Sequence, residues 1–74
     1  MNIISYMLEV YRPNSESETA CSFIAETPFP VMSKGEGIKF FPELDGQEWL
    51  VRKVVHLLWE VENKITFKTL VYTE

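Results

Sequence analysis

Residues 47–61, QEWLVRKVVHLLWEV, decide the fold of this chain, because the same letters are compatible with a helix and with a long strand. In the helical interpretation Asp45 is an N-cap and Glu48 completes a capping box. An apolar stripe would then face the core, made of Leu50, Val54, Leu57, Leu58 and Val61. An α+β fold with a helix at 47–61 is therefore the alternative interpretation.

The strand interpretation is favoured, because a helix would leave large apolar groups in water. Trp49, Val51 and Val55 lie off the helical apolar stripe or at its edge, and valine and tryptophan are mediocre helix formers. In a strand Trp49 and Val51 point inward, and one extra residue at 52–53 forms a β-bulge. The inward face then continues beyond the bulge with Val54, His56 and Leu58.

Four further segments read as strands. Residues 3–11, 19–27 and 65–72 alternate between apolar and polar positions, and 38–41 is a short apolar run. Polar or proline-rich segments separate them at 13–18, 28–30, 33–37 and 62–64, and Asp45–Gly46 is a hairpin signal. We predict one all-β domain over residues 1–74, a five-stranded small barrel with a long bulged fourth strand.

Three short motifs resemble a known family. The letters GEGI at 35–38, DGQEWLVRKVVH at 45–56 and LVYTE at 70–74 are similar to the GE-x-I, DG-x-x-W-x-V-x-x-V-x-H and V-Y-x-E pattern of small SH3-like β-barrel proteins. Many members are uncharacterised phage or bacterial proteins. The resemblance implies a partly open barrel that serves as a binding or assembly module. It assigns no site residue.

Length and cysteine content limit how this domain is stabilised. Natural domains near 74 residues often add disulfides, a metal or a partner subunit. Cys21 is the single cysteine, and His56 the single histidine, so neither an intrachain disulfide nor a zinc site is expected. Self-association remains, and we predict a homo-oligomer without a cofactor.

Charge and hydropathy disfavour several partners. A net charge of −4 opposes generic binding to nucleic-acid phosphates. The longest apolar stretches fall far short of the ~20 residues that cross a bilayer. The opening letters MNIISYMLEVYR lack the features of a secretory signal. We therefore expect a cytoplasmic protein that binds neither nucleic acid nor membrane.

No residue constellation predicts catalysis. Cys21 and His56 could in principle form a nucleophile and base, but no glycine elbow or helix N-terminus accompanies Cys21. The glycines at 35 and 37 flank a glutamate and precede no Walker lysine, so a turn explains them. We predict a protein without catalytic or metal-binding residues.

The strand interpretation instead predicts a binding surface. Beyond the bulge, Val55, Leu57 and Trp59 point outward together, and we expect an interface formed by them with Phe41 and Tyr72. The predicted function is a non-enzymatic binding or assembly module that self-associates, binds a protein partner, or does both. In the competing structural interpretation the same stripe is ordinary core, packed beneath the 13–18 loop or against another strand of the same barrel.

A different functional hypothesis uses the basic residues beside the bulge. Aromatic rings can stack on a nucleobase while basic side chains bind phosphate. The alternative function is therefore a small-ligand or nucleotide-binding barrel, of the kind that a phage protein acting against a host system would use. The candidate ligand-binding residues are Arg52, Lys53, Trp59 and Tyr72.

Overall fold

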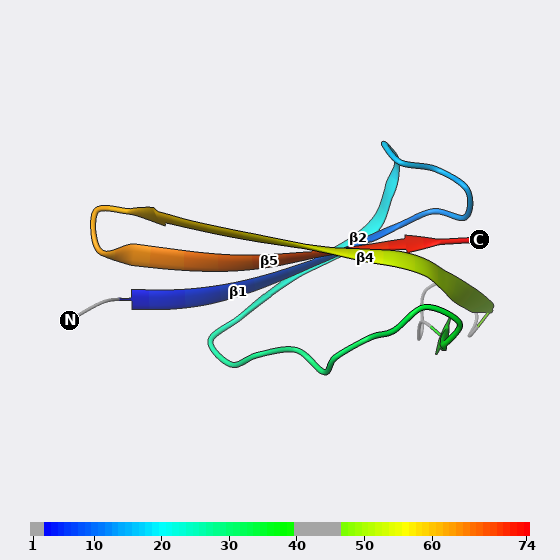
Figure 1. The fold of residues 1–74 in the computed structure, drawn as a ribbon, viewed down its shortest axis with the longest axis horizontal. Coiled ribbons are helices and arrows are strands. Elements are labelled where there is room, and N and C mark those ends of the chain that lie inside the picture. Colours follow the sequence, from blue (N-terminus) through cyan, green and yellow to red (C-terminus); the bar gives the residue numbers. More distant parts are fainter. Residues whose placement is uncertain (1–2, 40–46) are drawn as a thin grey trace.

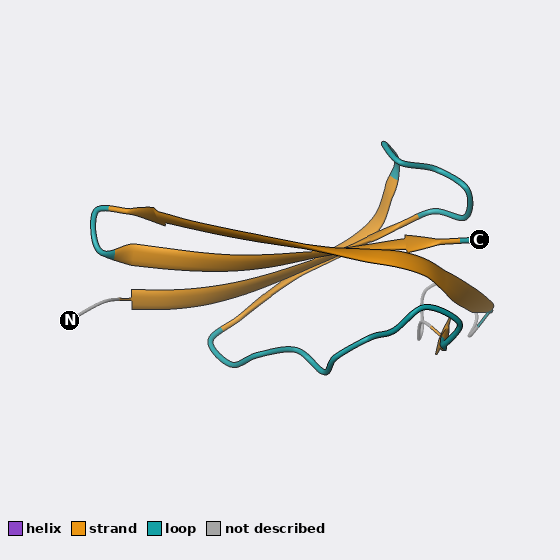
Figure 2. Ribbon diagram, viewed as in Figure 1, coloured by secondary structure: helices purple, strands orange, loops and turns teal. Residues whose placement is uncertain are grey.

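A computed structural model describes residues 3–39 and 47–74 of the chain. Within these residues the chain forms strands and no helix (Figure 2), namely β1 (Ile3–Tyr11), β2 (Thr19–Ala25), β3 (Gly37–Lys39), β4 (Glu48–Val61) and β5 (Lys64–Thr73). No helix in this part of the chain is long and apolar enough to cross a membrane. The all-β prediction is confirmed, and the α+β alternative is wrong because 48–61 is extended throughout.

The strands form one curled sheet in the order β2-β1-β5-β4-β3 (Figure 1). All neighbouring pairs are antiparallel except β1 and β5, which are parallel. Strands that run up and down around a barrel alternate in direction, so the first and fifth run the same way. The order is therefore that of an up-and-down barrel opened between β2 and β3, and the sheet is a strongly curled half-barrel.

The predicted bulge lies where the sequence placed it. Val51 pairs with Thr73 and Lys53 pairs with Tyr72, so Arg52 is the extra residue. Before the bulge β4 pairs with β3, and along the rest of its length it pairs with β5. The extra residue shifts the alternation by one position, which keeps both Val51 and Val54 on the core side of the sheet.

The core is small and lies at one end of the sheet. Leu8, Val10, Val51 and Val71 form its buried cluster, and Trp49 is buried nearby. Phe29 and Met32, from the loop after β2, pack against this cluster. Phe29 lies in the proline-rich segment 28–30, which the alternation of the strands does not assign to either face, and it is the loop after β2 that brings this side chain against the core.

The other end of the sheet projects beyond this core. The β4–β5 hairpin and the start of β1 form one end of the long axis in Figure 1, and the chain measures 40 × 22 × 20 Å. Its radius of gyration is 13.2 Å, whereas a compact domain of this length is expected near 11 Å. We call residues 3–7, 56–61 and 64–68 the distal sheet.

The predicted inward face runs past the end of the core. His56 and Leu58 share the face of Val54, as expected, but both are exposed, and Leu58 is 64% accessible. On β1 Ile4 is likewise exposed and Tyr6 is half-buried, and Leu8 is the first fully buried residue of the strand. The alternation of apolar and polar residues predicted correctly which face each side chain is on, but it also predicted burial for residues that are exposed.

Strand ends differ slightly from the expectations. β2 ends at Ala25 rather than at residue 27, and β3 begins at Gly37. The two-residue turn at Glu62 and Asn63 has φ of 49° and 66°, as a type I′ hairpin requires. Phe41 and the predicted Asp45–Gly46 hairpin signal lie outside the described residues.

Thr73 supplies a test of how the buried end of β5 is joined to the end of β1, where the 12–18 loop begins. Its side chain is fully buried, and its Oγ1 donates a hydrogen bond of 2.8 Å to the Tyr11 carbonyl. Thr73→Val keeps the shape but leaves that carbonyl without this donor, so we expect a loss of about 1–2 kcal/mol in unfolding free energy, measured in urea. Thr66→Val is the matched control, because Thr66 is buried on the same strand and its hydroxyl makes no hydrogen bond within the described residues. An equal loss in both variants would contradict the role of the bond.

Candidate functional site

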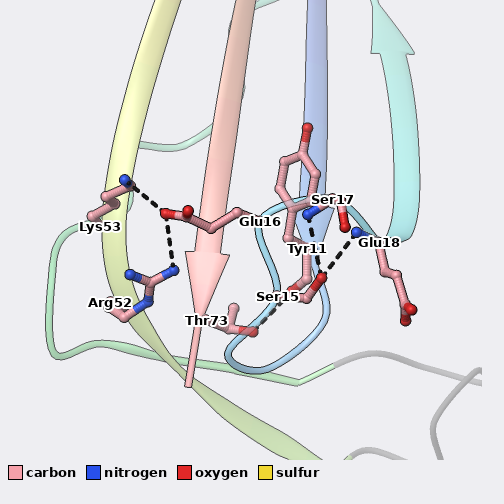
Figure 3. A network of polar contacts seen from close by, with 8 residues as sticks. All are labelled: Tyr11, Ser15, Glu16, Ser17, Glu18, Arg52, Lys53 and Thr73. Carbon is pink, nitrogen blue, oxygen red and sulfur yellow. Dashed lines mark hydrogen bonds and ion pairs between the residues drawn. The ribbon is translucent and has the colours of Figure 1, made fainter.

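The outer face of the sheet, opposite the core, has a polar region beside the bulge. The Lys53 Nζ lies 4.8 Å and the Arg52 guanidinium 5.8 Å from the centre of the Tyr72 ring. Tyr72 stacks on Tyr11 with centroids 4.7 Å apart. Glu16 reaches the same two cations, at 3.1 Å from the Lys53 Nζ and 3.6 Å from the Arg52 Nη2 (Figure 3). We call these five residues the cation cluster.

The loop between β1 and β2 holds Glu16 in place. The Ser15 Oγ accepts hydrogen bonds from the backbone N–H groups of Ser17 and Glu18 (Figure 3). Asn14 adopts a positive φ of 59°, and its N–H donates to the Thr73 carbonyl. The hydrogen bond from Lys53 and the charges of Lys53 and Arg52 lower the pKa of Glu16. The two cations therefore already have a carboxylate partner within the chain.

A second ion pair lies next to this cluster on the outer face. The Lys68 Nζ is 2.8 Å from the Glu9 Oε1, and the Tyr11 hydroxyl donates to the Glu9 Oε2 at 3.1 Å. The Lys68 hydrogen bond, more than the Tyr11 bond, lowers the pKa of Glu9 against a smaller opposing effect of burial. Burial and the neighbouring Glu9 raise the pKa of Tyr11.

Beside these polar groups, and from there towards the β4–β5 turn, the outer face carries the apolar residues that the sequence predicts to point outward. Val55 is half-buried, while Leu57 and Trp59 are 40% and 41% exposed. The 12–18 loop contacts the sheet at Lys53 and Thr73, on the near side of this stripe. The interpretation in which that loop covers the stripe is therefore wrong. Val55, Leu57 and Trp59 lie together on the outer face. Tyr72 is on the same face but packs in the cation cluster, and Phe41 lies outside the described residues.

Sequence reasoning missed the opposite face of the distal sheet. Leu58 and Phe67 are direct partners across β4 and β5, and Phe67 is the partner of Tyr6 on β1. The Tyr6 and Phe67 rings stack with centroids 5.4 Å apart. Ile4 and Phe23 extend this face and are exposed. The signal was present in the sequence, because VVHLLW at 54–59 is apolar at both odd and even positions, which makes both faces of the strand apolar.

The structure separates Cys21 from His56, the pair considered for catalysis, and it brings together only some of the residues considered for ligand binding. Cys21 and His56 lie on β2 and β4, which are separated in the sheet by β1 and β5. The His56 Nδ1 is 3.3 Å from the Thr69 Oγ1. Trp59 lies six positions beyond Lys53 on β4, about 20 Å along the strand, so it cannot share a small ligand with the cation cluster. Within 3–39 and 47–74, no three His, Cys, Asp or Glu side chains are grouped as a metal site requires.

Comparisons with protein-family models, with curated proteins and with solved structures found no match to this chain. The functional interpretation therefore depends on the geometry of its own residues.

Glu9 provides a test of the polar region by pH. A carboxylate whose pKa is lowered by folding stabilises the protein above the pKa of the unfolded chain, and this contribution disappears as the pH falls through the lowered value. We expect Glu9→Gln to lose about 1 kcal/mol at pH 7 and to show a weaker loss of stability between about pH 5 and pH 3, measured by urea unfolding. Glu26→Gln, which removes an exposed carboxylate without an ion pair in the described structure, should match the wild type. Identical pH profiles for all three proteins would contradict the role of the Glu9–Lys68 pair.

Proposed function

We propose that this chain is a non-enzymatic assembly module that self-associates through its distal sheet. The observation that carries the proposal is the exposure of large apolar side chains on both faces of that sheet. The outer face presents Leu57 and Trp59, and the core-side face presents Ile4, Leu58 and Phe67. Monomeric proteins seldom leave contiguous apolar patches of this kind in water.

The size of the core supports the same proposal. The buried apolar residues of the described chain are Leu8, Val10, Trp49, Val51 and Val71. Burial contributes about 25 cal/mol per Å² of apolar surface, so a core this small gives a thin margin of stability. Covering the distal sheet with a second subunit would add apolar burial at Leu57, Leu58 and Trp59, which the monomer leaves exposed. A protein partner with an apolar surface could use the same face.

Trp59→Asp tests this function. Trp59 is 41% exposed, so the monomer should tolerate the change, whereas a carboxylate in a desolvated interface is costly. We expect the wild type to form a defined oligomer by native mass spectrometry and sedimentation. The variant should raise its dissociation constant by more than about 30-fold while keeping its far-ultraviolet circular dichroism.

Val31→Asp is the matched control for this experiment. Val31 lies in the loop after β2 and is 85% exposed, so the same substitution there should leave the oligomer unchanged. A wild type that stays monomeric at every concentration, or an equal effect of both variants, would overturn the proposal.

A second candidate function follows from the cation cluster. Two cations beside a stacked tyrosine pair could bind a small anionic ligand such as a nucleotide, but Glu16 occupies the position that its phosphate would take. If this function operates, a nucleotide at about one hundred times its dissociation constant stabilises the fold by about 2.7 kcal/mol.

Thermal-shift measurements with nucleotides and cyclic dinucleotides check the second candidate. Lys53→Ala should abolish the shift, and Glu16→Gln should enlarge it because the competing carboxylate is gone. A melting temperature unchanged by every nucleotide in the wild type and in Glu16→Gln would contradict ligand binding at this cluster.

A further inference from the structure

One edge of the sheet has no neighbouring strand along most of its length. β3 spans only Gly37–Lys39 and pairs with residues 48–50 of β4. The preceding turn adds hydrogen bonds between Val51 and the backbone of Gly35 and Glu36. Beyond the bulge, β5 is the only strand paired with β4 among the described residues. We call the backbone of residues 54–60 the free edge.

The hairpin turn determines which backbone groups point outward along this edge. In a two-residue type I′ hairpin, the residues that flank the turn exchange both of their hydrogen bonds, and here these are Val61 and Lys64. Every second residue from Val61 back to Lys53 therefore bonds to β5. The N–H and C=O groups that point away from β5 belong to Val54, His56, Leu58 and Glu60.

The residues of the free edge favour a second copy of the same strand. Val54 to Trp59 carry five apolar side chains, and the polar residues on the core-side face of this edge are His56 and Glu60. Two copies that run antiparallel about Leu58 place His56 of each copy opposite Glu60 of the other, whereas two parallel copies in the same register would place Glu60 opposite Glu60.

The other sheet edge, β2, lacks this complementarity. β2 is flanked by Glu18 and Glu26 and has no basic residue between them. Two antiparallel copies of β2 would place these carboxylates together. The free edge of β4 is therefore the edge suited to symmetric pairing, and an antiparallel pair related by a two-fold axis closes after two subunits.

We propose, resting on the self-association proposed above, that the second subunit is bound edge to edge through antiparallel β4 strands, with the two-fold axis at Leu58. The two half-barrels then share one continuous sheet. Each copy contributes the outward backbone groups of His56, Leu58 and Glu60 to the shared ladder.

This register matches side chains on both faces. Residues directly opposite each other in an antiparallel pair lie on the same face. On the core-side face His56 lies opposite Glu60 of the second copy, and Leu58 lies opposite its own equivalent. On the outer face Leu57 lies opposite Trp59, and Val55 opposite Val61. The pairing ends at the hairpin turn, where Val54 lies opposite Glu62. An axis at His56 would instead extend the paired segment to the bulge at Arg52, next to Val51, whose backbone already bonds to Gly35 and Glu36. An axis at Leu57 would place Glu60, which is within the strand, opposite Val54.

Cysteine cross-linking tests the arrangement. In a Cys21→Ala background, Leu58→Cys should oxidise readily to a disulfide-linked dimer, because hydrogen-bonded partners in an antiparallel pair have Cα atoms about 5.5 Å apart. Phe67→Cys is the matched control, since Phe67 is the β5 partner of Leu58 on the same face. Its Cα atoms would be about 15 Å apart across the axis, too far for a disulfide.

The outcomes separate this proposal from the proposed function. A wild-type dimer by native mass spectrometry with cross-linking at position 58 and not at 67 supports edge pairing. A dimer that cross-links at 67 or at neither position overturns edge pairing and leaves self-association standing. A wild-type monomer at every concentration overturns both.

A proline substitution tests the backbone contribution directly. His56→Pro removes an outward N–H and leaves the ladder between β4 and β5 intact, whereas His56→Ala removes the same side chain and keeps the N–H. We expect the proline variant to raise the dissociation constant of the dimer at least about tenfold more than the alanine variant does. Equal dissociation constants in the two variants would overturn the pairing.

Discussion

The whole sheet depends on one extra residue in β4. Without Arg52 as a bulge, the strand could not keep Val51 on the core side and also continue its pairing with β5 on the same face. The bulge also increases local twist. At its start β4 bonds on both edges, to β3 through residues 48–50 and to Glu74, directly after β5, through the Leu50 carbonyl. Phe29 and Met32 pack against the core cluster of this curled sheet.

The same strand explains why the molecule is long and its core small. The β4–β5 hairpin extends well past the level of Leu8 on β1, while the loop after β2 runs along the sheet towards the opposite end (Figure 1), with Phe29 and Met32 against the core. Polar contacts on the outer face are also concentrated near the bulge, where Glu16 and Glu9 meet their cations. In the distal sheet Lys68 takes part in these contacts, yet large apolar side chains remain exposed on both faces, namely Leu57 and Trp59 on the outer face and Ile4, Leu58 and Phe67 on the core-side face.

Sequence reasoning predicted the strands, the bulge and the outward stripe, because alternation of side chains is a local property of an extended chain. It did not predict how far each face is buried, since burial depends on which loops reach which part of the sheet. Leu58 has the correct phase for the core yet is exposed, and Phe29, between two prolines, packs against the core cluster. Nor could it bring Glu16 to Lys53, a contact across 37 positions set by the β1–β2 loop.

The two edges of the sheet are protected to different degrees against the addition of another strand. Natural sheets guard their edges with short strands, charges, prolines or bulges. β2 is short, is flanked by glutamates and is followed by Pro28, all of which discourage the addition of another strand. β4 is guarded by its bulge and by Lys53 only at the start, and the positions from Val54 to Trp59 carry five apolar side chains around a single histidine. An unguarded apolar edge is a hazard for an isolated monomer, because it templates uncontrolled aggregation. It is no hazard when a partner strand covers it, so the contrast between the two edges favours β4 over β2 as the strand for the edge pairing that we propose.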